Sequence, residues 1–147
     1  MHRFKYEGWR RLARPLAQLM AERLAVEGVA ARFVVAVPLH RSRQRQRGYN
    51  QSELLTRELK KRLALLSLPG VLVRTRATPP QVGHDRRQRF ENVASAFVWR
   101  GELLQGEAVL LIDDVATTGA TLDACAHALK AAGSGPVTGV SLARVNV

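Results

Sequence analysis

The sequence predicts an α/β domain in which a parallel sheet is flanked by helices. Segments of strand length alternate along the chain with amphipathic segments of helical length. The strand candidates are continuously apolar, which is typical of strands buried on both faces of a parallel sheet. The chain has 147 residues, of which 46% are hydrophobic, so it is long enough for one domain with a substantial core. We expect a single domain over 1–147, with a helical N-terminal part over 1–30 and the core over 31–147.

The first half of the chain predicts two helices separated by a strand. Residues 8–27 carry apolar side chains at helical spacing, and Pro15 marks where the regular part of this helix starts. The apolar run 32–38 predicts a strand. Residues 50–66 predict the second helix, with Asn50 as its N-cap. The apolar stripe of this helix consists of Leu54, Leu55, Leu59, Leu63 and Leu66.

The second half of the chain predicts further strands and one more helix. A helix over 121–133 ends at Gly133. The segment 74–92 is polar and rich in arginine, so it predicts a long loop. Strands are expected over 71–74, 95–99, 107–114 and 137–145.

The composition excludes several classes of protein. The single cysteine, Cys125, excludes a disulfide scaffold and a cysteine-based zinc site within this sequence. No apolar run approaches the length of a membrane span. The basic amino terminus has no apolar segment behind it, unlike a secretory signal. We therefore expect a cytoplasmic protein that is not inserted in a membrane.

The charge of the chain is strongly basic and unevenly distributed. There are 23 basic and 12 acidic residues, and residues 1–100 hold 21 of the basic and 7 of the acidic ones. Most of the basic residues are arginine, whose planar fork binds phosphate with two hydrogen bonds. This bias indicates phosphate or nucleic-acid partners, although a GC-rich genome produces the same bias.

Two aspartates, Asp113 and Asp114, end the apolar strand 107–114, and a small-residue turn follows it. Ligands bind beyond the carboxyl ends of the strands in parallel sheets. Asp113 and Asp114 are acceptors suited to sugar hydroxyls, and residues 116–121 read Ala-Thr-Thr-Gly-Ala-Thr before the next helix. A helix start preceded by small residues exposes backbone N–H groups to a phosphate. The alternative is an ordinary strand-turn-helix in which Thr117 or Thr118 serves as N-cap.

An arginine-rich segment follows the other strand end, at Val37. Arginines alternate there with polar residues, and in an extended chain they would all point to one side and form a dense anion site. The alternative is a solvated, nonspecific basic loop. The arginines are Arg41, Arg43, Arg45 and Arg47.

The run LLIDDVATTGAT resembles the phosphoribosyl pyrophosphate (PRPP) motif of type I phosphoribosyltransferases. The segments VPLHR, RGYNQSELL, TPPQVGHDRRQRFENVASAF and FKYEG are similar to those of the ComF-type family, which also includes the GntX proteins. This is a family of competence-associated phosphoribosyltransferase-like proteins. The resemblance covers nearly the whole chain and implies the type I phosphoribosyltransferase fold.

The resemblance also implies a set of binding residues. Asp113 and Asp114 would bind the ribose hydroxyls, and Mg²⁺ would bridge the pyrophosphate near them through PRPP, without zinc ligands from the protein. The 5′-phosphate would be bound by Ala116, Thr117, Thr118, Gly119, Ala120 and Thr121. The pyrophosphate would be bound by Pro38, Leu39, His40 and Arg41.

In the resembled superfamily, the loop that corresponds to 74–92 closes over PRPP and supplies a cation to the departing pyrophosphate. The candidates for that cation are Arg86, Arg87 and Arg89, and the alternative is a basic loop that touches no substrate. Members that use hypoxanthine or guanine carry a carboxylate where this chain has Thr117, which argues against that subgroup. Longer members also have a cysteine-rich zinc ribbon, which this sequence does not contain.

Two functions follow from the resemblance. The first is a Mg²⁺-dependent enzyme of natural competence that transfers a phosphoribosyl group from PRPP to an unidentified nitrogen acceptor. The second is a non-catalytic basic adaptor that binds single-stranded DNA or the uptake motor and keeps a vestigial or regulatory sugar-phosphate site. Tyr49, Phe90 and Trp99 near basic residues would supply stacking platforms for the second. A homodimer is suggested by the resemblance alone.

Overall fold

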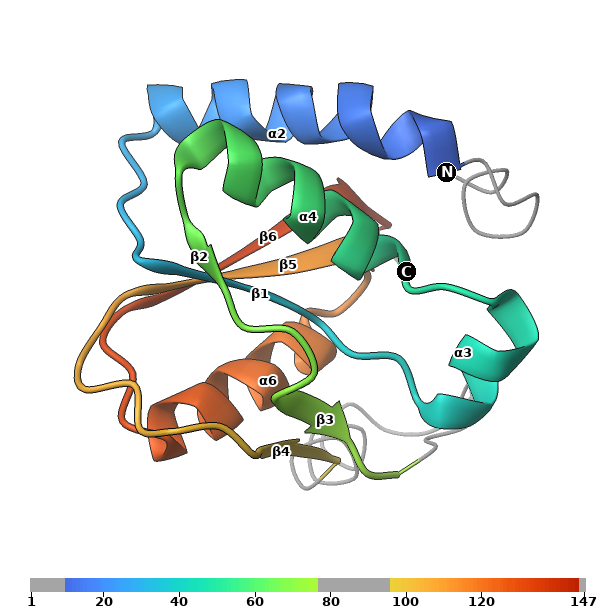
Figure 1. The fold of residues 1–147 in the computed structure, drawn as a ribbon, viewed down its shortest axis with the longest axis vertical. Coiled ribbons are helices and arrows are strands. Elements are labelled where there is room, and N and C mark those ends of the chain that lie inside the picture. Colours follow the sequence, from blue (N-terminus) through green and yellow to red (C-terminus); the bar gives the residue numbers. More distant parts are fainter. Residues whose placement is uncertain (1–9, 77–95, 146–147) are drawn as a thin grey trace.

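The computed structural model describes residues 10–76 and 96–145. They form a parallel sheet between two layers of helices (Figure 1). The sheet has the strand order β2-β1-β5-β6, and each neighbouring pair is parallel. The strands are β1 (Phe33–Ala36), β2 (Leu66–Ser67), β5 (Val109–Ala116) and β6 (Val137–Arg144). This arrangement confirms the predicted α/β class and the parallel sheet.

Three long helices cover the two faces of the sheet. A short 3₁₀ turn, η1 (Arg10–Leu12), leads into α2 (Ala13–Val26), which packs beside α4 (Gln51–Leu63) on one face (Figure 1). The helix α6 (Ala120–Ala131) lies on the opposite face. Pro15 occupies the first turn of α2, where its missing N–H has no intrahelical partner, so the helix starts two residues before it.

The central strand β5 divides the hydrophobic core in two, because its successive side chains point to opposite faces. Leu110 and Ile112 pack with α2 and α4 in the α4-side core, which contains Ala17, Met20, Leu24, Val34, Leu55 and Leu59. Val109 and Leu111 pack with α6 in the α6-side core, which contains Val35, Val37, Leu72, Phe97, Cys125 and Leu129. Both faces of the strand are therefore buried, as its continuously apolar sequence predicted.

The arginine-rich segment after β1 is helical, so the extended conformation that the sequence analysis expected is wrong. Residues Arg41–Arg47 form α3. The His40 side chain caps the first turn by accepting from the Ser42 backbone N–H, and Gly48 ends the helix with a φ of 76°. Arginine and glutamine are good helix formers, so capping at both ends fixes a helix in this short polar run. The four arginines consequently do not all point to one side.

The second predicted helix is correct in position but ends early. Asn50 is its N-cap, as predicted, and the helix stops at Leu63 with Ala64 as C-cap at a φ of 52°. Leu66 therefore does not belong to the apolar stripe of the helix. It starts β2 instead, an edge strand whose backbone pairs with β1 while the Leu66 side chain remains exposed.

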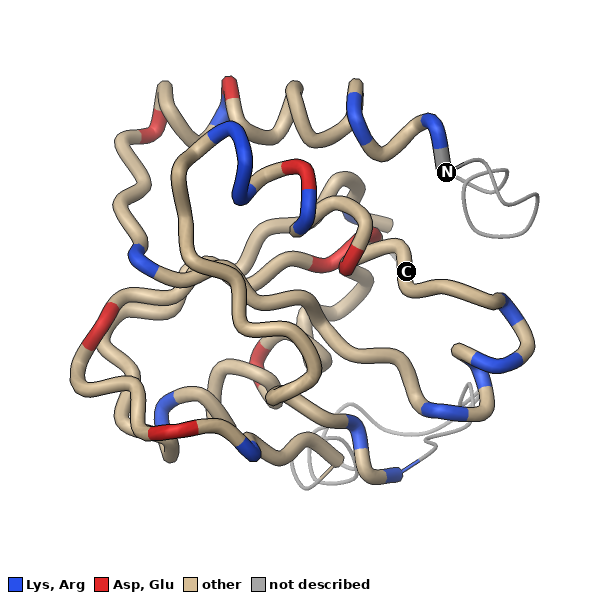
Figure 2. The backbone as a smooth tube through the Cα atoms, viewed as in Figure 1, with Lys and Arg blue, Asp and Glu red and all other residues tan. Residues whose placement is uncertain are grey.

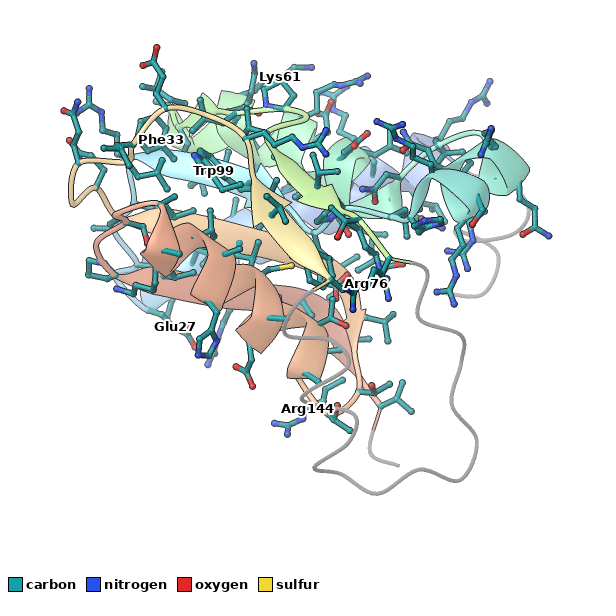
Figure 3. The ribbon with its side chains drawn as sticks, turned by 90° about the horizontal axis from the view of Figure 1, so that it is seen from below. Glu27, Phe33, Lys61, Arg76, Trp99 and Arg144 are labelled. Carbon is teal, nitrogen blue, oxygen red and sulfur yellow. The ribbon has the colours of Figure 1, made fainter. Side chains whose placement is uncertain are left out.

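The two short predicted strands form a separate antiparallel pair. Strand β3 (Leu72–Arg74) pairs with β4 (Phe97–Trp99), and both pack against α6 rather than joining the main sheet. Figure 3 shows this pair beside α6, with Arg76 where the described chain leaves β3. The Trp99 indole N–H donates to the Glu102 carbonyl at 2.8 Å. Within the two described ranges, no helix is long and apolar enough to cross a membrane.

Cys125 is buried in the α6-side core. Burial raises the pKa of its thiol well above the usual value, and the nearby Asp113 carboxylate raises the pKa further. Because the thiolate is the nucleophile, a thiol held protonated in this way is unreactive.

A substitution at the core position Leu111 should destabilise the fold far more than one at an exposed leucine. Leu111 is fully buried, so Leu111→Ala should lower the free energy of unfolding by about 2–5 kcal/mol through lost burial and a cavity. Leu103 is 73% exposed, and Leu103→Ala should change the free energy of unfolding by less than about 0.5 kcal/mol. Urea denaturation of the two variants compares them directly. Equal midpoints would contradict the core assignment.

The thiol of Cys125 gives a chemical probe of the same core. At about pH 8, native Cys125 should react with an aromatic disulfide reagent far more slowly than the urea-unfolded chain, because burial keeps the native thiol protonated. Absorbance of the released thiol measures both rates. Stoichiometric reaction of the native protein at the unfolded rate would show that the thiol is accessible and ionised.

Candidate functional site

The two aspartates lie inside β5 rather than at its end. The sequence analysis expected the strand to stop at Asp114, but β5 continues to Ala116, and Val115 and Ala116 pair with Ala143 and Arg144 of β6. Both aspartates are only 8% exposed. The strand therefore holds two carboxylates at the carboxyl-end edge of the sheet, where parallel sheets bind ligands.

Hydrogen bonds orient both carboxylates. Asp113 Oδ1 accepts from the Asp114 backbone N–H at 2.9 Å and from the Ser52 hydroxyl at 3.3 Å. Asp114 Oδ1 accepts from the Val115 N–H at 2.9 Å. Because one oxygen of each carboxylate is bound to the strand itself, the direction of each group is set by the backbone of β5.

A tight turn joins the end of β5 at Ala116 to α6, two residues beyond Asp114. Gly119 is the N-cap of α6 with a φ of 85°, a conformation that favours glycine, and Thr118 Oγ1 accepts from the Ala120 N–H at 3.4 Å. The turn surrounds a shallow recess of about 30 Å³. Its walls are Asp113, Val115, Ala116, Thr117, Gly119, Ala120, Thr121 and Leu122. The structure therefore gathers five of the six predicted phosphate residues and one of the aspartates around one hollow, with Thr118 in the same turn.

The predicted pyrophosphate segment starts beside this edge. The Val37 N–H donates to the Ile112 carbonyl at 2.8 Å, so Pro38 and Leu39 leave β1 next to the aspartates of β5. His40 has a structural role here, because its Nδ1 lies 2.8 Å from Ser42 Oγ and caps α3. Arg41 is exposed in the first turn of α3. The loop candidates Arg86, Arg87 and Arg89 lie outside the described residues.

Arg74 is a residue of the site that the sequence analysis missed. It ends β3, half-buried, with its guanidinium 5.4 Å from the centre of the Phe97 ring. Burial lowers the pKa of Arg74 and the positive charge of Arg43 lowers it further, while the negative charge of Asp113 acts in the opposite direction. The charges of Arg43, from α3, and Asp113, from β5, thus both act on the Arg74 guanidinium. The sequence indicates a role for Arg74 only through its position as a charged residue at the end of an apolar strand.

A larger groove, of about 220 Å³, lies next to the site on the β2 side. It runs between α4 and the segment 67–70, with Val35 and Leu72 on its apolar floor and Arg57 and Lys60 at its rim. Pro38 is the one predicted binding residue among its walls. The groove is therefore separate from the hollow that Asp113 and the β5–α6 turn form.

The donor set of the site suits Mg²⁺ only together with a ligand. Within residues 10–76 and 96–145, no group of three or more His, Cys, Asp or Glu side chains could hold a metal ion. Mg²⁺ is commonly bound by one or two carboxylates plus the phosphates of a substrate. Asp113 and Asp114 supply that number of hard oxygen donors, so the residues present fit a magnesium ion carried by a phosphorylated ligand.

Two curated relatives are similar in sequence to this chain. Competence protein F of Haemophilus influenzae is 34% identical over 154 residues, covering 98% of this chain and 66% of that protein. DNA utilization protein YhgH of Escherichia coli K12 is 39% identical over 105 residues, covering 71% of this chain and 45% of that protein. The chain thus spans between about half and two thirds of the length of these relatives. No family model matches the chain.

Solved structures with the same fold are phosphoribosyltransferases. Adenine phosphoribosyltransferase of Leishmania tarentolae superposes with a TM-score of 0.55 at 17% identity, covering 88% of this chain and 56% of that one. Hypoxanthine phosphoribosyl transferase of Trypanosoma cruzi superposes with a TM-score of 0.50 at 11% identity, covering 94% and 74%. At such identities the likeness concerns the fold alone. The solved structures show that the chain has the type I phosphoribosyltransferase fold. The sequence relatives show that the chain belongs to the ComF-type family, related to Competence protein F and YhgH.

Proposed function

We propose that this protein binds PRPP at the carboxyl-end edge of its sheet and, with Mg²⁺, transfers the phosphoribosyl group to a nitrogen acceptor in a process of DNA uptake. The observation that carries the proposal is the placement of two buried, oriented carboxylates near the end of β5, shortly before a glycine turn and a helix start. A sugar phosphate can donate its hydroxyls to the two carboxylates and place its phosphate at the turn and the helix start.

Each end of the ligand has its own residues in this proposal. Asp113 and Asp114 accept hydrogen bonds from the ribose hydroxyls. The 5′-phosphate lies at the mouth of the recess, where the turn 117–119 and the start of α6 supply N–H and hydroxyl donors. The segment 38–41, which leaves β1 beside β5, binds the pyrophosphate.

The positive charge at this edge supports the pyrophosphate assignment. Arg43 lowers the pKa of Arg74, and an anion bound nearby would offset that effect of like charge. In the reaction, the acceptor nitrogen bonds to ribose C1, the bond from C1 to the pyrophosphate oxygen breaks, and pyrophosphate leaves with the electron pair while the nitrogen loses a proton to water. The arginines favour the step because they stabilise the charge on the leaving group. Bound Mg²⁺ would neutralise part of the same charge.

The names of the relatives supply the biological setting. One is called a competence protein and the other a DNA utilization protein. We extend this setting to the present chain as part of the proposal, since the chain spans only part of each relative.

The ribose assignment can be tested by calorimetric titration with PRPP in the presence and absence of Mg²⁺. The wild type should bind PRPP with Mg²⁺, and the double variant Asp113→Asn, Asp114→Asn should bind at least about tenfold more weakly, because it loses charge-assisted hydrogen bonds.

Glu102→Gln is the matched control, since Glu102 is an exposed carboxylate outside the site. It should bind PRPP as the wild type does. Wild-type affinity in the aspartate double variant would refute the ribose site, and absence of PRPP binding to the wild type would refute the proposed function.

Binding of single-stranded DNA is a second candidate function, and α3 favours it. This helix has the sequence RSRQRQR, contains no apolar residue and has no buried residue. A helix that is polar all round gains little from packing, and Arg41 and Arg45 are exposed to a partner. Figure 2 shows basic residues along α3. Arg41 and Arg45 lie one turn apart and face the same side.

The DNA candidate predicts a steep salt dependence that α3 controls. Binding of a labelled oligonucleotide should weaken as salt increases. Arg41→Gln with Arg45→Gln should reduce the slope of log K against log salt by about 0.7 for each phosphate that the helix no longer neutralises. Fluorescence anisotropy at several salt concentrations measures the slope.

The control removes the same charge elsewhere, with Arg14→Gln and Arg62→Gln, both exposed and on other helices. It should leave the slope nearer to that of the wild type. Identical slopes in the two double variants would mean that only net charge matters, and no binding at low salt would exclude direct contact with DNA.

A further inference from the structure

The segment RGYNQ, residues 47–51, connects two helices in a defined way. Arg47 is the last residue of α3, and Gly48 ends that helix in the left-handed conformation, where its N–H donates to the Gln44 carbonyl. Asn50 begins α4 as its N-cap, with Oδ1 accepting from the Ser52 N–H at 3.0 Å. The segment helps to mark the family, yet the function proposed above gives it no role.

Asn50 and Ser52 close a ring of hydrogen bonds between the two ligand-binding segments. The Asn50 amide donates from Nδ2 to the Val37 carbonyl at 3.0 Å. Val37 donates its N–H to the Ile112 carbonyl, and Ile112 precedes Asp113 in β5. The Ser52 hydroxyl, at the start of α4, donates to Asp113 Oδ1 and completes the ring. The ring thus joins β1, β5 and α4 through these three hydrogen bonds, the bond between the Ser52 N–H and Asn50 Oδ1, and the chain itself.

The members of this ring are shielded from water. Asn50 is 2% exposed and Ser52 is 3% exposed. A buried side-chain hydrogen bond is costly to leave unmade, so the ring holds its geometry strongly. Val37 is the last residue before the predicted pyrophosphate segment, and Asp113 is a predicted ribose residue. The ring therefore ties the start of one binding segment to a carboxylate of the other.

We infer that Asn50 and Ser52 are positioning residues, which fix the separation between the segment after β1 and the carboxylates of β5. This inference rests on the proposed function, because it assigns the two segments to opposite ends of one ligand. The residues touch the backbone of one segment and a carboxylate of the other, and they act on the ligand only through these groups.

A ligand with two bound ends makes the inference specific. PRPP links a ribose 5-phosphate half to a pyrophosphate half, so after one half binds, the other binds with an effective concentration set by how well the two segments are spaced. Loosening the ring should therefore weaken PRPP strongly. It should affect ribose 5-phosphate and pyrophosphate little when each is bound alone, because each then uses only one segment.

The test uses two substitutions with a matched control. Asn50→Ser keeps a good N-cap residue, but its side chain is too short to reach the Val37 carbonyl. Ser52→Ala removes the hydrogen bond to Asp113, and Ser52→Thr restores a hydroxyl. Thr56→Val is the control, because Thr56 is a buried residue one turn further along α4 and its hydroxyl has no hydrogen-bond partner in the described structure.

Titration calorimetry with Mg²⁺ would compare PRPP, ribose 5-phosphate and pyrophosphate. With Asn50→Ser and Ser52→Ala, the Kd for PRPP should rise about tenfold or more while the Kd values of the two halves change less than about threefold. Ser52→Thr and Thr56→Val should resemble the wild type. Equal weakening of all three ligands, or no weakening of PRPP, would overturn the inference. If Asn50→Ser does not fold, the two Ser52 variants decide by the same criteria.

Hydrogen exchange separates this inference from the proposed function. If the wild type binds no PRPP, the proposed function fails, and with it the assignment of a ligand to the ring. The spacing role is then judged from amide exchange of the free protein. Faster exchange at the Val37 N–H in Asn50→Ser, with unchanged exchange in the middle of α4, would support the ring as a spacer. Unchanged exchange at Val37 would overturn it.

Discussion

Burial of β5 on both faces is the constraint on which the rest of the structure depends. Residues 109–112 have no polar side chain, so each face must be covered: Leu110 and Ile112 by α2 and α4, and Val109 and Leu111 by α6. Covering both faces places the start of α4 and the start of α6 at the same edge of the sheet. The carboxylates that follow Ile112 are thereby surrounded by Ser52 from one layer and by the β5–α6 turn from the other.

The parts of the fold that long-range burial determines could be predicted from the sequence. The apolar runs of β1 and β5 and the stripe of α4 are visible as patterns, and they define the parallel sheet and its layers. Asn50 was predicted as a cap because its side chain acts on the backbone two residues away. The turn after Asp114 was also visible, since its glycine and threonines are local signals, although their roles toward a ligand stay predictions.

Other features could not be read because they depend on partners distant in sequence. Strand β2 has two residues and exists only through pairing with β1, so Leu66 looked like a continuation of the helical stripe. The alternating arginines of α3 suggested an extended chain, whereas capping by His40 and Gly48 makes the segment helical. Arg74 belongs to the site because β3 pairs with β4 and packs on α6, and no sequence period reports that.

The strand order β2-β1-β5-β6 also determines how the molecule must assemble. Strand β1 is synthesised before its long partner β5, whose paired residues follow 76 positions later, and β2 offers it only two residues. Contacts between distant segments slow folding, because the chain loses entropy before they form. On the ribosome, Val35 therefore remains without its main cover until β5 and α6 emerge, whereas α2 and α4, which pack on Val34, are made before β5. A chaperone that shields the open side of β1 until β5 emerges would therefore reduce aggregation of the nascent chain.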